Sequence, residues 1–383
     1  MRYLDGNRLT LLRNGEQYFP ALVAAIDGAR VEVFLETYIF ADDETGSLVA
    51  DALARAAARG VAVHLLIDGF GARDFAPRFR TMLAEAGARM LVYRPKISPW
   101  TLRRNRLRRM HRKLACVDGS CAFVGGINVI DDYDAPNDTT PRHDYAVRIE
   151  GPLTAAVRAE AARLWRLVAL TTRHTQPLPP APAAPAQLAR GQRAALVVRD
   201  SLRHRRDIED AYLELMEGAR EEILIANAYF FPGRRFRQAL TAAAQRGVRV
   251  VLLVQGLVEY LVPHYASRAL FGTLLDAGIR IEEYHYSFLH AKVAVFDRCR
   301  ACVGSSNIDP FSLLLAREAN VFVDDAAFAA ELRASLQQAM RSGARPLPSL
   351  AWRRRPLWRR ALNWIAYGIA RLVIGYASYE RYH

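Results

Sequence analysis

His111-Arg-Lys113-Leu-Ala-Cys-Val-Asp118 occurs a second time further along the chain, as His290-Ala-Lys292-Val-Ala-Val-Phe-Asp297. Three other stretches recur around it in the same order. Residues 36–40 return as 227–231, residues 59–67 return as 246–254, and Gly125-Gly-Ile-Asn128 returns as Gly304-Ser-Ser-Asn307. Four landmarks in one order indicate that a whole domain has been duplicated.

Both copies also share a pattern of alternating strands and helices. In the first copy the sequence predicts strands at 30–39 and 61–67, a helix at 47–59, and a strand–turn–strand at 113–124. In the second copy it predicts strands at 222–230, 248–254, 293–296 and 301–303, with helices at 234–246 and 266–277. Strands that alternate with helices predict the α/β class, here as two tandem α/β/α repeats.

The chain has 383 residues, which exceeds what one hydrophobic core usually supports, so we expect two domains. The Pro-rich segment at 176–185 fits neither a helix nor the interior of a sheet. We therefore expect a first domain at 1–172, an exposed Pro/Ala-rich linker at 173–190, a second domain at 191–345 and a basic amphipathic tail at 346–383.

The chain is strongly basic, with 53 Lys and Arg against 39 Asp and Glu, a formal net charge of +14 and a pI of about 10.0. Such a surplus predicts a polyanionic partner, either nucleic acid or an anionic membrane surface. The hydrophobic content of 51% excludes a wholly disordered chain, and four Cys are too few for a disulfide scaffold. Because we find no secretory signal and no uncharged apolar run of about 18 residues, we expect a cytosolic protein or one bound to a membrane from the cytosolic side.

The repeated motif carries side chains suited to phosphoryl chemistry. A His and a Lys two residues apart on a strand point to the same face, and an Asn arrives from the next strand. Two such sets allow one His to attack phosphorus while the other protonates the leaving alkoxide, with two Lys and two Asn holding the charged oxygens. No Asp/Glu cluster with magnesium spacing accompanies them, so we expect transfer without a metal. The alternative, a structural role for each His, is disfavoured because the complete set is duplicated.

The doubled pattern His-x-Lys-x4-Asp-x6-Gly-Gly/Ser-x-Asn resembles the phospholipase D superfamily, and the likeness extends from about Gly6 to Leu332. Flanking stretches are similar to the bacterial cardiolipin synthases that lack amino-terminal membrane spans. These stretches are Arg109-Met-His-Arg-Lys113, Asp144-Tyr-Ala-Val-Arg-Ile-Glu-Gly151, Ala226-Asn-Ala-Tyr-Phe-Phe-Pro-Gly233, Val303-Gly-Ser-Ser-Asn-Ile-Asp-Pro310 and Glu318-Ala-Asn-Val321. The doubled motif is specific for the superfamily, and the synthase assignment rests on the flanking matches.

This resemblance implies that the two halves pack around a pseudo-twofold axis and build one shared active site. It implies that His111 attacks phosphorus to form a phosphohistidine and that His290 serves as the acid and then as the base, without a cofactor. The residues that would hold the phosphate oxygens are Lys113, Lys292, Asn128, Asn307 and, in the second half only, Ser305.

The resemblance further implies that Asp144 and Glu318 orient the two His rings through their other ring nitrogens. Asp118 and Asp297 belong to the catalytic motif, but each follows its strand at a turn. We therefore expect these two aspartates to support the site from behind. Gly126 stands where the second half has Ser305, so we expect an asymmetric site.

The four cysteines allow two interpretations. Cys299 and Cys302 have zinc-like spacing and, with Cys116 and Cys121, would offer four thiolates. The two pairs, however, do not occupy equivalent positions of the repeat, and Cys116 lies on a predicted core strand. We interpret all four as small buried hydrophobic residues.

Two basic segments indicate contact with an anionic surface. The run Arg103–Arg109 precedes the first motif, where it is either a solvated face or a collector of anionic substrate. The tail carries arginines between Arg353 and Arg360, followed by an apolar helical stripe with a narrow polar edge. The stripe is Leu362, Ile365, Ile369, Leu372, Val373 and Tyr376, and the edge is Asn363, Tyr367 and Arg371. We expect a helix lying in the membrane interface, in preference to one packed on the body or spanning the bilayer.

The function implied by the resemblance is a phosphatidyltransferase that makes cardiolipin and glycerol from two phosphatidylglycerol molecules. Its partners would be this anionic phospholipid and the membrane surface, with no nucleic acid. The residues themselves indicate only metal-independent transfer of a phosphodiester. The alternatives are a phospholipase D-type hydrolase or nuclease, which would have little use for the tail, and a non-catalytic membrane-binding protein.

Overall fold

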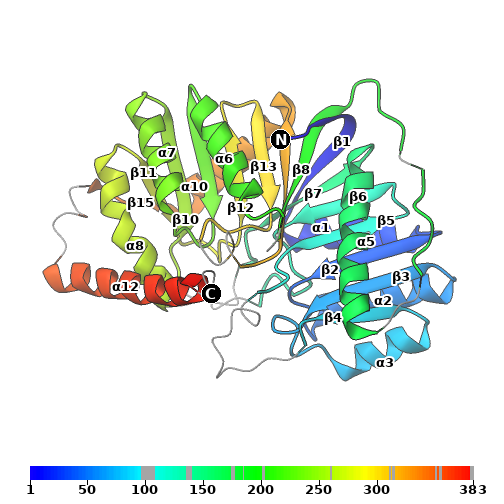
Figure 1. Cartoon of the computed structure of the whole chain (residues 1–383). Coiled ribbons are helices and arrows are strands. Elements are labelled where there is room, and N and C mark those ends of the chain that lie inside the picture. The colour runs from blue at the N-terminus through cyan, green and yellow to red at the C-terminus, as the bar shows by residue number, and fades with distance from the viewer. Residues whose placement is uncertain are drawn as a thin grey trace.

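The strands of both repeats hydrogen-bond into one mixed sheet, which the computed structural model of the chain shows with helices around it (Figure 1). The structure describes residues 1–95, 108–134, 140–173, 177–183, 185–200, 203–258, 261–309, 312, 315–349, 352 and 356–379.

The elements follow each other in the same order in the two halves. The first half consists of β1 (Leu4–Arg13), α1 (Asn14–Asp27), β2 (Glu32–Thr37), α2 (Glu44–Ala58), β3 (Ala62–Asp68), α3 (Pro77–Glu85), β4 (Arg89–Tyr93), β5 (Lys113–Val117), β6 (Cys121–Gly125), β7 (Tyr145–Glu150) and α5 (Leu153–Thr172). The second half consists of β8 (Gln192–Arg199), α6 (Asp207–Gly218), β9 (Glu222–Asn227), α7 (Arg234–Gln245), β10 (Arg249–Gln255), α8 (Leu261–Asp276), β11 (Arg280–Tyr284), β12 (Lys292–Phe296), β13 (Arg300–Gly304), β14 (Glu318–Asp324) and α10 (Ala326–Gly343). Strand β15 (Ala344–Pro346) and helix α12 (Leu357–Tyr379) come after them.

The order of the strands is mirrored about the centre of the sheet. Among the described residues the order is β15-β11-β10-β9-β12-β13-β14-β8-β1-β7-β6-β5-β2-β3-β4. Counted outward from the central β1–β8 pair, each strand of one half has its counterpart at the same place in the other, and β15 is added at one edge. The predicted α/β class and tandem repeats are therefore confirmed.

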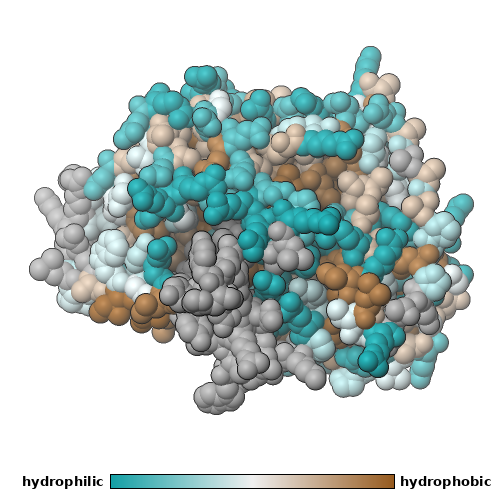
Figure 2. Space-filling view, viewed as in Figure 1, coloured by the Kyte–Doolittle hydropathy of each residue, from teal (hydrophilic) through white to brown (hydrophobic). Residues whose placement is uncertain are grey.

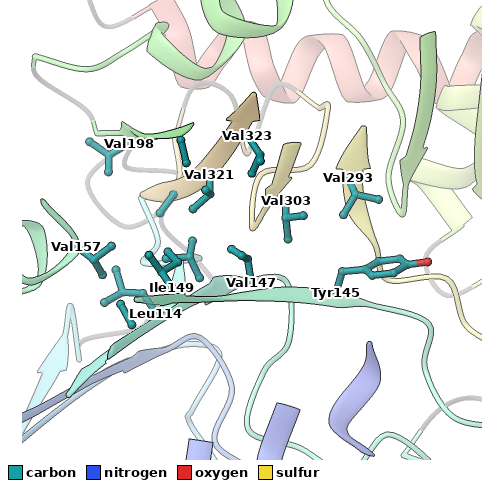
Figure 3. Close-up of a cluster of buried hydrophobic side chains, with 14 of the residues drawn as sticks. Leu114, Tyr145, Val147, Ile149, Val157, Val198, Val293, Val303, Val321 and Val323 are labelled. Atoms are coloured by element: carbon teal, nitrogen blue, oxygen red, sulfur yellow. The ribbon is translucent and has the colours of Figure 1, made fainter. Parts of the chain in front are cut away.

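The two halves pack against each other through a shared apolar core (Figure 3). Val147 and Ile149 of β7 lie toward Val303 of β13 and Val321 of β14, and helices α5 and α10 bury their apolar stripes in the same cluster. Because side chains alternate along a strand, the opposite face of each half-sheet needs its own cover. Helices α1, α2 and α3 provide it in the first half, and α6, α7 and α8 provide it in the second.

The helices and strands predicted from the sequence are all present, with ends shifted by a few residues. The largest difference is α8, which begins at Leu261 rather than at 266. The Pro-rich connection lies between the end of α5 at Thr172 and the start of β8 at Gln192. It is tied to the first half, because Arg89 donates to the carbonyl of Pro177 at 3.2 Å and Arg158 donates to that of Pro179 at 3.0 Å.

The motif aspartates fasten each half-sheet at the end remote from the histidines. Asp118, at the turn after β5, accepts hydrogen bonds from the backbone N–H groups of Arg30, Val31 and Glu32 at 2.8, 2.8 and 2.9 Å. Asp297, after β12, accepts three equivalent bonds from residues 220–222 at 2.7 to 3.1 Å. Both residues have positive φ, 51° and 49°. Through these bonds the two aspartates hold the start of β2 and of β9, a supporting position of the kind expected from the sequence.

Candidate active site

Each motif histidine lies just before its strand and is hydrogen-bonded to the other half of the molecule. The N–H of His111 donates to the carbonyl of Arg317 at 3.0 Å, and the N–H of His290 donates to that of His143 at 2.9 Å. The two rings keep 17% and 12% of their side-chain surface exposed, so both are accessible from outside while their backbone is fixed. The two motifs therefore meet at the junction between the halves.

The carboxylates that orient the histidines are exchanged between the halves. His111 Nδ1 lies 2.9 Å from Oε1 of Glu318, and His290 Nδ1 lies 2.6 Å from Oδ2 of Asp144. Both carboxylates are buried. A carboxylate that accepts from Nδ1 fixes the proton there and leaves the lone pair on Nε2. The structure thus brings Asp144 and Glu318 to the rings as the resemblance implied, but each serves the histidine of the opposite half.

Each motif lysine is hydrogen-bonded to the backbone of the histidine in its own motif. Lys113 Nζ donates to the carbonyl of His111 at 2.6 Å, and Lys292 Nζ donates in the same way to the carbonyl of His290. Both side chains are almost completely buried. Desolvation, aided by repulsion from Lys292 and opposed by Glu318, lowers the pKa of Lys113 to about 7. An ammonium group carries three N–H donors, so both lysines are candidates for contact with an anion.

The same surroundings keep both histidines neutral near pH 7. Burial lowers the pKa of His111, with further lowering from Lys113 and Lys292 against an opposing contribution from Glu318. Burial, repulsion from both lysines and repulsion from His111 place the pKa of His290 well below its ordinary value. Burial also raises the pKa of Asp144 to about 6. A group of cation-forming side chains that are desolvated together favours a bound anion, which relieves their mutual repulsion.

The two motif asparagines follow β6 and β13 and are buried. Asn128 Oδ1 accepts from the N–H of Ile39 at 3.1 Å, which holds its amide in place. Asn307 Oδ1 has no hydrogen-bond partner among the described residues. A contact with phosphate oxygens would use the Nδ2 N–H donors of Asn128 and Asn307, and it stays a prediction for both residues.

Ser305 is hydrogen-bonded to one of the two carboxylates that orient the histidines. Its hydroxyl donates to Oε2 of Glu318 at 2.5 Å, so its single proton is used within the protein. In this structure Ser305 therefore supports the carboxylate that orients His111, and its contact with phosphate stays a prediction. In the first half, a Cβ built on Gly126 would lie 2.3 Å from Oδ1 of Asp144. Glycine is needed there because the shorter Asp144 comes against the backbone.

Three further side chains of the site were not predicted. The Tyr38 ring lies edge-on to His111 with centroids 5.0 Å apart, and Lys113 Nζ lies 5.3 Å from the centre of the same ring. Asp68 accepts from the N–H of Met110 at 2.8 Å and so fixes the segment that leads into His111. Asn227 faces Lys292 across the β9–β12 pair, and its buried Nδ2 has no hydrogen-bond partner among the described residues. Tyr38 and Asn227 belong to the recurring stretches 36–40 and 227–231, which is the signal that could have found them.

The structure also bears on the four cysteines and on the basic run before the first motif. Cys116 belongs to the shared core and Cys302 to the outer core of the second half, and burial raises the pKa of each thiol to about 12. The four-thiolate zinc hypothesis is therefore wrong, and the described part of the chain brings no three His, Cys, Asp or Glu side chains together as a metal site. Of the basic run Arg103–Arg109, residues 103–107 lie outside the described residues.

The sequence is similar to one family of known proteins. Residues 22–165 and 212–340 match the family model described as cardiolipin synthase, PLD-like domain. Cardiolipin synthase B of Escherichia coli K12 is 37% identical over 377 residues, covering 96% of this chain and 88% of the relative. The major cardiolipin synthase ClsA of Bacillus subtilis 168 is 30% identical over 363 residues, covering 94% and 74%.

Solved structures share the fold. The phosphatidylserine synthase of Haemophilus influenzae Rd KW20 superposes with a TM-score of 0.70 at 12% identity, covering 95% of this chain and 94% of that one. A polyphosphate kinase from Porphyromonas gingivalis superposes with a TM-score of 0.59 at 17% identity, covering 95% and 53%. At these identities the likeness is one of fold alone.

We predict that an anion enters this site together with a proton. The pKa of both histidines is lowered in the free protein, and a bound anion raises it again, so protonation and binding favour each other. Sulfate, whose own charge is constant near neutral pH, should bind more tightly as the pH falls from about 8 to about 6. Calorimetry in two buffers of different ionisation heat should give net proton uptake at about pH 7. A pH-independent affinity without proton uptake would contradict the electrostatic account.

Proposed function

The chain belongs to the phospholipase D-like cardiolipin synthase family, and from that premise we propose that it joins two phosphatidylglycerol molecules into cardiolipin and releases glycerol. The observation that supports this most directly is the exchanged pair of histidine–carboxylate contacts, which makes one site out of two half-motifs. Such a site offers two imidazoles to a single phosphodiester. That is the requirement of a transfer in which one group attacks and another protonates the departing alcohol.

In the proposed first step, His111 is the nucleophile. Its Nδ1 is held by Glu318, so Nε2 attacks the phosphorus of the first phosphatidylglycerol and a P–N bond forms. The bond from phosphorus to the headgroup glycerol oxygen breaks. His290, protonated on Nε2 once the anionic substrate is bound, gives its proton to that oxygen, and glycerol leaves.

The proposed second step reverses the proton transfer. Neutral His290 takes the proton from a headgroup hydroxyl of a second phosphatidylglycerol, whose oxygen attacks the phosphohistidine. The P–N bond breaks, His111 is regenerated and cardiolipin forms. Throughout both steps, Lys113, Lys292, Asn128 and Asn307 would stabilise the charge on the phosphate oxygens, a task that a metal ion performs in many other phosphoryl transferases.

The proposal also places the protein at a membrane, because its substrate and product are lipids. We infer a peripheral protein of the cell membrane, bound at its cytoplasmic face, with anionic phospholipid as its partner. Within the described part of the chain, no helix has both the length and the apolar character needed to cross a bilayer. The net charge of +14 supports attraction to an anionic lipid surface.

The proposed reaction is tested by the lipids formed. Purified protein incubated with phosphatidylglycerol vesicles and a chelator should produce cardiolipin and glycerol in equal amounts. Chelation should have no effect, since lysines take the electrostatic role of a metal. Phosphatidic acid as the sole product would instead indicate a hydrolase, and DNA cleavage without lipid turnover would indicate a nuclease. The absence of any turnover would favour a non-catalytic membrane-binding protein.

We predict that His111→Ala and His290→Ala each lower kcat by roughly a thousandfold or more, because neither half-motif can complete the reaction alone. Asp118→Asn is a matched control within the same motif. It removes part of a backbone tie, so it should reduce the free energy of unfolding by about 1–2 kcal/mol while the folded protein keeps its rate. A near-normal rate in either His variant would contradict the shared site.

The phosphohistidine should form on one histidine only. The surroundings of the two rings differ, since Asp144 lies against Gly126 in one half and Glu318 is bonded to Ser305 in the other. Mass spectrometry after brief exposure to substrate and an alkaline denaturing quench should place the phosphatidyl adduct on His111. Equal labelling of His111 and His290 would contradict distinct roles. Labelling of His290 alone would mean that His290 is the nucleophile and His111 the acid and base.

A further inference from the structure

Helix α12 is fastened to the body by the side of the helix that carries its small residues. Ala366 and Ala370 are buried against Ala266 and Leu270 of α8 in one apolar cluster. Small side chains allow two helices to approach closely. The Tyr367 ring extends the contact, lying edge-on to Phe231 with centroids 5.5 Å apart. In Figure 1 the helix accordingly lies along the edge of the second half, beside α8.

The large apolar residues of α12 point away from this contact. Trp358, Leu362, Ile365, Ile369 and Leu372 recur at intervals of three and four residues and form one exposed stripe. The exposed fractions of Trp358, Ile365 and Leu372 are 63%, 60% and 75%. Figure 2 shows apolar surface at the lower edge where Figure 1 places α12. A surface helix that faces only water normally turns its apolar stripe toward the body of the protein. The exposure of this stripe therefore indicates a partner that is itself apolar.

The helix is connected to the catalytic edge by a short series of contacts. Phe231, which Tyr367 touches, donates its backbone N–H to the carbonyl of Ile308 at 2.8 Å. Ile308 follows the site residue Asn307 directly, and its own N–H donates to Asn227 Oδ1 at 3.0 Å. α8 follows β10 and begins with the exposed Leu261 and Val262. The stripe is therefore fixed relative to the edge on which the site is built.

The charge next to the stripe selects the kind of partner. In the sequence Arg353, Arg354 and Arg355 precede the stripe, Arg359 and Arg360 follow its first residue, and Arg371 is exposed within α12. An apolar stripe flanked by arginine and tryptophan matches an anionic lipid interface, where the apolar face enters the acyl boundary and the cations meet the headgroups. A second copy of this chain would bring the same net charge of +14, and the two basic surfaces would repel each other.

We propose that α12 docks flat on an anionic bilayer through the stripe of Trp358, Leu362, Ile365, Ile369 and Leu372. It thereby holds the catalytic edge at a fixed orientation to the surface that contains the lipid. The choice of lipid rests on the proposed function, but the docking surface does not. This interpretation combines two alternatives raised by the sequence: α12 packs on the body with its small side and meets the membrane with its large side.

The test uses the full-length protein and vesicles of phosphatidylglycerol mixed with phosphatidylcholine. The double variant Ile365→Glu/Ile369→Glu places two charges in the stripe without touching the contact with α8. Its binding in vesicle flotation should fall by roughly tenfold or more, with turnover on vesicles falling in parallel. Turnover on detergent-dispersed phosphatidylglycerol should stay near the wild-type rate.

The matched control is Leu167→Glu/Leu170→Glu on α5. It introduces the same two negative charges at exposed apolar residues of another helix. It should float as the wild type does. Equal loss in both variants, or wild-type flotation of the stripe variant, would overturn the docking surface. The docking surface would also be overturned if light scattering showed that the stripe mediates dimers in solution. If the wild type makes no cardiolipin even in detergent, the proposed function fails, whereas the flotation comparison still decides the docking surface.

Discussion

The exchange of carboxylates between the halves is the constraint on which the rest of the site depends. His111 is oriented by Glu318 and His290 by Asp144, so neither imidazole has its partner unless the two half-sheets are packed together. The backbone repeats this exchange, because each histidine N–H donates to a carbonyl of the opposite half. The apolar core shared by β7, β13 and β14 sets the distance at which these contacts form. Packing between the halves is thus part of the catalytic geometry, not only of stability.

Much of this arrangement could be predicted from the sequence, and the missing part has a physical reason. The repeat of His-x-Lys and its neighbouring Asn predicted the two halves and the inward-facing side chains, because period-two alternation on a strand is a local property. Which carboxylate serves which histidine is not local: Asp144 and Glu318 each lie close in the chain to their own motif, and only the packing of the halves selects the distant partner. The face of α12 was unpredictable for a similar reason. Periodicity locates the stripe of large residues, but only the fit of Ala366 and Ala370 against α8 decides which side meets the body.

The two halves also show how a duplicated site becomes asymmetric while keeping its geometry. In the first half the short Asp144 reaches His290 by lying against Gly126, where a Cβ would be 2.3 Å from the carboxylate. In the second half Glu318 is one methylene longer than aspartate. The Ser305 hydroxyl limits the additional side-chain freedom by donating to Glu318 Oε2 at 2.5 Å. Glycine with aspartate and serine with glutamate are therefore matched pairs. The two rings consequently differ in the support behind the carboxylate, although both keep Nδ1 bound and Nε2 free to react.

The electrostatics of the site connect folding with catalysis. If Lys113, Lys292 and both imidazoles were charged, four buried cations would face the two carboxylates Asp144 and Glu318, and each uncompensated buried charge costs several kcal/mol. The protein avoids much of this cost because burial lowers the pKa of both histidines and brings that of Lys113 to about 7. An arriving phosphodiester supplies the negative charge that makes protonation favourable again. In the proposed mechanism, the imidazolium that protonates the leaving alcohol would therefore be generated by the substrate itself, and the free site would not have to store it.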